Sequence, residues 1–259
     1  MKSIFTSSFF LCSLLFIGLL VSCNKGTGLE PIDKVNLEEG LEMYFPFDGN
    51  STETITDVTY DTHGATYSHD RFNRPKSSLC LSKNYLNIDV GMGNSLGTLS
   101  FWVSIPDTTR YQTYLFAKGN QQLGVLRYGL GVSEGEVSLI SDVNRWGSRD
   151  SMSSFNPLQT VSIIRPNRWH HIVVRWSDAD EFVEIFVDNK LETSAPYLAN
   201  WFLMDDLEGD SQTMGATWHY GGHDTGDYLS YFKGQVDELR RYNRRISDEE
   251  IEALYTIEE

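Results

Sequence analysis

Aromatic residues in polar or glycine-rich stretches are the first part of this sequence whose chemistry suggests a site. Sugars present C–H faces and hydroxyls together, so a carbohydrate site needs flat rings beside polar groups. Trp102, Trp169 and Trp176 stand in strand-like runs, and we assign them to the core. Five aromatics outside such runs could stack on sugar, or each could pack against its own loop. This candidate carbohydrate platform consists of Trp146, Trp201, Trp218, Tyr220 and Tyr228.

The acidic residues lack the pattern that glycoside hydrolysis requires. Two carboxyl groups must reach one sugar from the same side of the site. Glu134 and Glu136 share a strand face, but no third acid follows at the required spacing. Glu181 and Glu184 are three residues apart, so a strand places them on opposite faces. We therefore predict no catalytic residues.

The histidines offer only weak metal sites. His170 and His171 are adjacent, so a strand directs them to opposite faces, and we expect them to pack beneath a turn. His219 and His223 flank a Tyr-Gly-Gly segment, and two aspartates follow. That loop could bind a metal or a sugar, or it could be a solvent-exposed glycine loop.

The N-terminus is typical of an export signal rather than of a folded element. Lys2 precedes an apolar run over residues 4–21, and the run ends in Leu-Val-Ser-Cys at residues 20–23. This ending resembles the lipobox of bacterial lipoproteins, which implies that Cys23 becomes the lipidated N-terminus of the mature protein. The alternative is a membrane-spanning anchor in which Cys23 is incidental.

Charge and cysteine content narrow the function classes. Lys and Arg number 21 against 36 Asp and Glu, a formal net charge of −15, so the surface repels phosphate backbones and we predict no nucleic acid partner. Cys12 lies in the signal, and Cys23 carries the predicted lipid. Cys80 then has no disulfide partner, and we expect it to be a buried apolar residue.

The elements that must position any site are short strands. Ten or more runs rich in Val, Ile, Phe, Tyr and Trp alternate with Gly, Asn and Asp turns, which predicts a sandwich of two antiparallel sheets. In residues 182–188, Val183, Ile185 and Val187 form one aliphatic face, and Asp-Asn-Lys follows as a turn. Ser247, with Glu250 three residues later, predicts the start of one short C-terminal helix.

Several segments, taken in order, resemble the bacterial LamG-like domains of the concanavalin A-like lectin/glucanase superfamily. The resemblance implies an all-β jelly-roll sandwich and covers residues 41–257, although the loop after Asn50 departs from the family's Gly/Asn/Asp-rich pattern. It does not imply one activity, because such domains include glycan binders, adhesion modules and modules attached to enzymes. The matching segments are YFPFDGN (44–50), DRFNRP with its apolar extension (70–81), SFWVSIP to YGLGV (100–132), RWHHIVVRWS to VDNKLE (168–192) and YFKGQVDELRRYNRRISDEEIEALY (231–255).

The resemblance also implies a structural calcium. In the LamG-like pattern, the Asp of the early Phe-Asp-Gly and the Asp of the late Gly-x-Val-Asp-Glu are suited to share one ion. These match Asp48 and Asp237, with Asn50 as a possible third ligand, and hard cations favour such oxygen ligands. Alternatively, Asp48 caps the turn at Gly49, and Asp237 makes a buried hydrogen bond to the backbone.

The sequence therefore predicts three parts: a lipoprotein signal peptide (1–22), lipidated Cys23 with a flexible tether (23–40), and one LamG-like domain (41–259). We expect a non-catalytic lipoprotein of the bacterial cell envelope, on the outer membrane or cell surface. It would be anchored to the membrane by lipid and would bind a polysaccharide or other glycan. The second hypothesis is an adhesion or assembly module that binds an envelope protein, and a glycoside hydrolase comes third.

Overall fold

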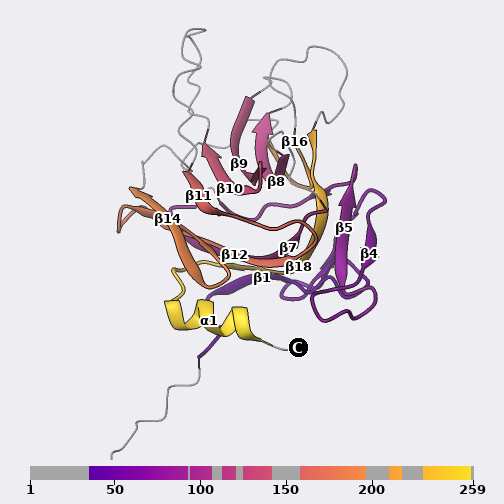
Figure 1. The fold of residues 1–259 in the computed structure, drawn as a ribbon, viewed down its shortest axis with the longest axis horizontal. Coiled ribbons are helices and arrows are strands. Elements are labelled where there is room, and N and C mark those ends of the chain that lie inside the picture. The colour runs from indigo at the N-terminus through magenta and orange to yellow at the C-terminus, as the bar shows by residue number, and fades with distance from the viewer. Residues whose placement is uncertain are drawn as a thin grey trace, which may run out of the picture. The chain divides into compact units, whose positions relative to one another are not determined.

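Two antiparallel sheets form the body of the protein. The computed structural model describes residues 35–92, 94–106, 113–120, 125–141, 158–196, 210–217 and 230–257. All of these belong to the unit Val35–Glu259. Figure 1 shows the two sheets as stacked layers, with the single helix below the larger one. The predicted all-β sandwich with one C-terminal helix is confirmed.

The larger sheet has eight strands and carries the site described below. Its central strands pair side by side over nearly their whole length, with β12 and β18 on the two sides of β7. The strands, in order across the sheet, are β14 (Lys190–Pro196), β13 (Phe182–Val187), β12 (Trp169–Ser177), β7 (Leu96–Ser104), β18 (Lys233–Tyr242), β5 (Ser78–Ser82) and β4 (Thr66–Ser68), with β1 (Leu41–Phe45) also paired to β18.

The smaller sheet has six strands and packs on one face of the larger sheet. Two small two-stranded sheets complete the strands of the described residues: β2 (Thr52–Glu53) with β3 (Val58–Thr59), and β16 (Ala216–Thr217) with β17 (Ser230–Tyr231). The strands of the smaller sheet, in order, are β11 (Leu158–Ile163), β10 (Glu136–Ser141), β9 (Val125–Ser133), β8 (Thr113–Asn120), β15 (Asp210–Met214) and β6 (Leu86–Asn87).

Alternation along the strands divides the side chains between the core and the outer face. Val183, Ile185 and Val187 of β13 lie in the core between the sheets, as predicted. The following turn has positive φ at Asp188 (50°) and Asn189 (61°), which is the backbone of a type I′ hairpin. Asp and Asn tolerate this conformation better than other non-glycine residues, so the turn fixes the register of β13 with β14.

The helix α1 (Asp248–Thr256) packs on the outer face of the larger sheet. Ser247 accepts a hydrogen bond from the Glu250 amide, and the Glu250 carboxylate accepts one from the Ser247 amide, so the predicted capping box is present. Ile251 and Leu254 pack against Val173 and other apolar residues of the sheet. The described residues contain no helix with the length and hydropathy to cross a bilayer.

Candidate functional site

A groove of about 500 Å³ opens on the outer face of the larger sheet, beside the end of α1. Its wall combines a loop, two central strands and the last turn of the helix. Four aromatic or cationic side chains and the helix end meet there. The lining residues are Arg71, Phe72, Trp102, Trp169, Tyr255, Thr256 and Ile257.

Strand alternation places two tryptophans in this groove. In β12, Ile172, Val174 and Trp176 face the core, so Trp169 faces outward because it is an odd number of residues from Trp176. Trp169 is only half-buried, which corrects its assignment to the core. Trp102 is 8% exposed and lines the groove, whereas Trp176 is fully buried as expected.

The loop between β4 and β5 is shaped by one carboxylate. Asp70 accepts hydrogen bonds from the backbone amides of Phe72 (2.9 Å) and Arg74 (2.7 Å) and from the Arg74 side chain (2.5 Å). Asn73 then adopts a left-handed backbone (φ 64°), which Asn tolerates. These contacts fold Asp-Arg-Phe-Asn-Arg-Pro into a tight loop whose Arg71 and Phe72 reach the groove.

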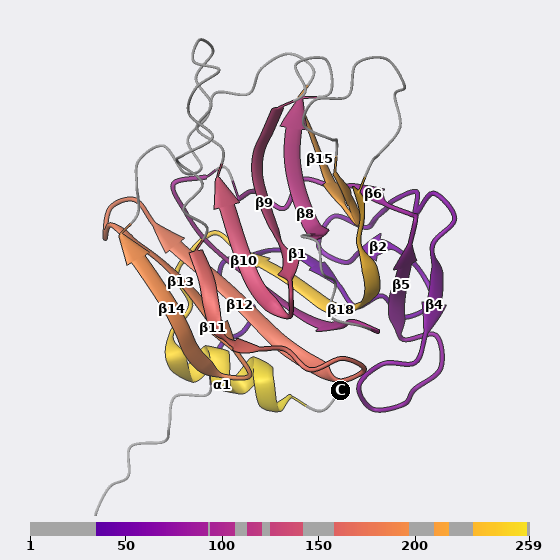
Figure 2. The same cartoon turned by 45° about the horizontal axis from the view of Figure 1, so that its top comes forward.

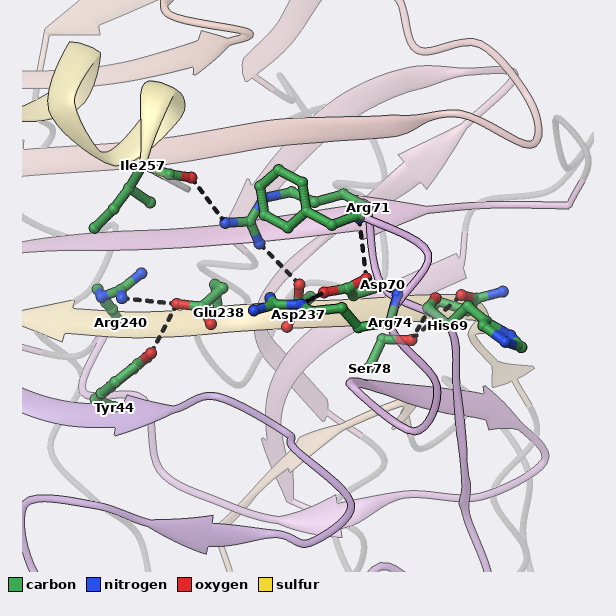
Figure 3. A network of polar contacts seen from close by, with 12 residues as sticks. Tyr44, His69, Asp70, Arg71, Arg74, Ser78, Asp237, Glu238, Arg240 and Ile257 are labelled. Carbon is green, nitrogen blue, oxygen red and sulfur yellow. Dashed lines mark hydrogen bonds and ion pairs between the residues drawn. The ribbon is translucent and has the colours of Figure 1, made fainter. Parts of the chain in front are cut away.

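Arg71 joins the loop, the sheet and the end of the helix. Its Nη1 donates to Asp237 Oδ2 at 2.9 Å, and its Nη2 donates to the carbonyl oxygen of Ile257 at 3.2 Å (Figure 3). The guanidinium carbon lies 4.8 Å from the ring centroid of Trp102 and 4.4 Å from that of Phe72. The side chain is 5% exposed, so these contacts form inside the wall of the groove.

The neighbouring carboxylates sit at an irregularity of β18. The pairing of β18 with β7 shifts between Asp237 and Arg240, and Glu238 has a left-handed backbone (φ 52°), which is strained for this residue type. Glu238 Oε2 accepts hydrogen bonds from Tyr44 (2.8 Å) and from Arg240 Nη2 (2.7 Å), as Figure 3 shows. The bulge thus places two adjacent buried acids on the strand that borders the groove.

Burial shifts the titration of two groups beneath the groove. Burial and the neighbouring Glu238 carboxylate raise the pKa of Asp237, and Arg71 acts in the opposite direction. Burial lowers the pKa of His171 to about 3; the charges of Arg240 and Arg71 add to this, while Asp188 opposes it. His171 is therefore neutral at physiological pH.

Ser100 and His171 form a hydrogen bond of 2.8 Å, but the arrangement is no catalytic triad. Both residues are buried, and His171 Nδ1 has no hydrogen-bond partner within the described ranges. The nearest acid, Asp188, instead binds the ring of His170 (2.8 Å) and the backbone amide of His171 (3.0 Å). The adjacent histidines thus pack at the Asp188 turn, in agreement with the expectation from their spacing.

The predicted calcium ligands have other contacts in this structure. Asp48 is exposed, and Asn50 Oδ1 accepts the Thr52 amide at 2.8 Å. Asp237 is bonded to Arg71, a positive charge that competes with a metal ion for this carboxylate. Across the described part of the chain, no three His, Cys, Asp or Glu side chains form a metal-binding group.

The other predicted site residues lie outside the described residues. They include the whole aromatic platform, the two histidines of the glycine loop and the predicted lipidation site. Cys80 is half-buried, rather than fully buried as expected. The residues outside the description are Cys23, Trp146, Trp201, Trp218, His219, Tyr220, His223 and Tyr228.

Residues 82–252 match the family model of the concanavalin A-like lectin/glucanases superfamily. The protein belongs to this superfamily. The match confirms the predicted family and includes β7 and β12, which contribute Trp102 and Trp169 to the groove. No curated protein sequence matches this superfamily member.

Solved structures share the fold of this superfamily member at low sequence identity. Domain 4 of AbnA, an extracellular arabinanase from Geobacillus stearothermophilus solved with arabinotriose, has 16% identity and a TM-score of 0.61, covering 83% of this chain and 98% of that one. The ligand-binding domain of botulinum neurotoxin serotype D, solved with N-acetylneuraminic acid, has 13% identity and a TM-score of 0.55. A Trypanosoma rangeli sialidase has 14% identity and a TM-score of 0.53. The matches cover 83% of this chain but 50% of the toxin chain and 32% of the sialidase chain.

The groove offers stacking surfaces to a ligand. Among the described residues that line it, none carries a carboxyl group, whereas hydrolysis of a glycosidic bond uses two. The sequence did contain evidence that one of the two tryptophans of β12 faces away from the core. The odd spacing of Trp169 and Trp176 places them on opposite faces of one strand, so they cannot both be core.

Proposed function

We propose that this protein is a lipid-anchored, non-catalytic carbohydrate-binding module of the bacterial cell envelope. The observation that carries the proposal is the aromatic groove. A strand, a loop and a helix each contribute a ring to it, namely Trp169, Phe72 and Tyr255. Rings that converge from separate elements form a preformed surface for the C–H faces of a sugar, and carbohydrate sites are built in this way.

The related folds support a carbohydrate ligand. The arabinanase domain was solved with arabinotriose, and the toxin domain was solved with N-acetylneuraminic acid. Membership of the superfamily allows lectin-like and glucanase-like functions alike, so the choice between them rests on the site. The described residues of the groove lining carry no carboxyl group, which favours binding without hydrolysis.

Binding to a polysaccharide and glycan array tests the proposal directly. The full chain, purified in detergent, should bind at least one glycan. Trp169→Ala should weaken that binding, and Val58→Ala provides the control, because Val58 is an exposed apolar residue of β3 that does not line the groove. The aromatic platform outside the described residues is probed by Trp146→Ala, Trp201→Ala and Trp218→Ala. Failure of the folded protein to bind any glycan would overturn the proposal.

The lipid anchor is a separate element of the proposal and has its own test. The Leu-Val-Ser-Cys ending supports lipidation of Cys23. In a bacterial host, Cys23→Ala should prevent lipidation and move the protein from the membrane fraction to a soluble or secreted fraction. Metabolic labelling with a fatty-acid probe distinguishes lipidation from a spanning anchor, because only the lipidated chain takes up the label.

A second candidate function is binding of an envelope protein. The edge strands β11 and β14 lie side by side (Figure 2) and expose Val161, Ile163 and Leu191. An apolar surface beside an open strand edge is suited to a protein partner. If this surface carries the function, Val161→Lys with Ile163→Lys should abolish a cross-link formed in the cell envelope. Trp169→Ala should leave that cross-link intact.

A further inference from the structure

Three buried carboxylates cluster behind the groove, on the loop that carries Arg71 and on β18. Each is at most 4% exposed, so each needs a compensating positive charge nearby. A guanidinium supplies that charge in every case, and Figure 3 shows all six side chains. The pairs are Asp70–Arg74 at 2.5 Å, Asp237–Arg71 at 2.9 Å and Glu238–Arg240 at 2.7 Å.

The pairing occupies the charged group that the described residues place in the groove. Arg71 is the only charged residue among the described residues of the lining, and both of its terminal nitrogens donate to protein oxygens. A calcium ion bound at Asp237 would have to displace the Arg71 guanidinium. A carboxylated sugar would have to compete with Asp237 for that same guanidinium, from a side chain that is 5% exposed.

The rings, by contrast, are accessible. Phe72 is 42% exposed, Tyr255 is 37% exposed, and Trp169 is half-buried at the start of β12. Trp102 lies beneath them, stacked on Tyr255 and contacted by Arg71. Arg71 thus polarises and supports the aromatic floor, and the rings supply the apolar part of the surface available to a ligand.

We propose that the groove binds an uncharged sugar through its C–H face, without calcium. The inference rests on the proposed carbohydrate-binding function and specifies its ligand class. It also assigns Arg71 as a positioning residue, whose charge pairs with Asp237 and holds Phe72 and the helix end in place. The net charge of −15 also favours an uncharged ligand, because it repels acidic polysaccharides.

The test compares matched neutral and acidic polysaccharides on the full chain in detergent. Arabinan, xylan, galactan and glucan form the neutral set, and polygalacturonate and alginate form the acidic set. Affinity is measured at about 50 and about 500 mM NaCl, each with calcium and with chelator. We expect a neutral polysaccharide to bind with less than about a twofold change across these conditions, and acidic ones to bind at least about tenfold more weakly.

Site variants connect the ligand class to the groove. Phe72→Ala and Trp169→Ala should each weaken neutral binding about three- to tenfold, the range expected for losing one aromatic contact. Val58→Ala, at an exposed residue of β3 that does not line the groove, should leave neutral binding unchanged. A circular dichroism spectrum and thermal unfolding of each variant verify that it is folded.

The outcomes separate this inference from the function on which it rests. Preferential binding of an acidic polysaccharide, lost at high salt, would overturn the ligand class and keep carbohydrate binding. Loss of binding in chelator would overturn the calcium-independent site. Neutral binding that survives both ring substitutions would place the site elsewhere. If no polysaccharide binds, the proposed function itself fails.

Discussion

The indole ring of Trp102 stacks on the phenol ring of Tyr255, with centroids 5.6 Å apart and 12° between the ring planes. Trp102 belongs to β7 in the centre of the larger sheet, and Tyr255 belongs to the last turn of α1. The helix therefore does more than cover apolar residues of the sheet. Its end forms one side of the groove, so the stability of the helix and the shape of the groove are linked.

Tyr255→Ala should weaken glycan binding, because it removes both a groove wall and the support of Trp102. Its cost in the free energy of unfolding should be only about 0.5–1.5 kcal/mol, the value of one aromatic pair. Isothermal titration calorimetry and urea unfolding measure the two effects. Tyr255→Phe is the matched control, since it keeps the ring, and it should bind as the wild type does.

The two tryptophans at the ends of β12 should behave oppositely. Trp176 is fully buried and donates to the Asn94 carbonyl at 2.7 Å, so Trp176→Ala should lower the free energy of unfolding by about 3–5 kcal/mol. Trp169→Ala should lower it by less than about 1 kcal/mol while reducing glycan affinity. Urea unfolding of both variants decides the point. Equal destabilisation would mean that Trp169 also belongs to the core.

Arg71→Gln should destabilise the protein by about 3–5 kcal/mol, because it leaves a buried Asp237 carboxylate without its partner. The double variant Arg71→Gln/Asp237→Asn should recover part of that loss, since it removes the unpaired charge. A double-mutant cycle from denaturant unfolding measures the coupling. Recovery of Arg71→Gln by added calcium would show instead that a metal can take the place of the guanidinium.

Stability should fall as the solution is acidified, with a contribution from His171. Its pKa in the folded protein, about 3, lies below the value of 6.5 for an unperturbed histidine. Between these values the unfolded chain binds a proton that the folded protein does not, so unfolding becomes more favourable as pH falls, by up to about 1.4 kcal/mol per pH unit. Above pH 6.5 the effect is absent. Thermal unfolding across this range should show a shallower decline for His171→Gln, and an unchanged decline would contradict the assignment.

Short sequence patterns correctly predicted the core-facing side of β13 and the start of α1. The face of Val183 and Ile185 followed from alternation, and the start of α1 followed from the spacing of Ser247 and Glu250. Both depend on residues close together in the sequence. The prediction of an all-β sandwich followed from many such strands, each of which needs one apolar face to be buried.

The groove could not be predicted in the same way, because it depends on contacts between distant segments. Arg71 meets Asp237 across 166 residues, and the hydrogen bonds to Asp70 help to orient the loop toward that partner. From the resemblance we expected Asp237 to bind calcium, whereas in the structure its carboxylate pairs with the Arg71 guanidinium. Trp169 was assigned to the core because it stands in a strand-like run. Alternation alone already places it on the opposite face of the strand from Trp176.

The contact between Arg71 and the carbonyl of Ile257 has a practical consequence. Anything fused directly after this region emerges beside the aromatic rings, so a C-terminal affinity tag is expected to obstruct the ligand. Immobilisation through that end would make the protein look inactive on a sensor chip. An attachment point on the opposite side of the sandwich leaves the groove open to solution.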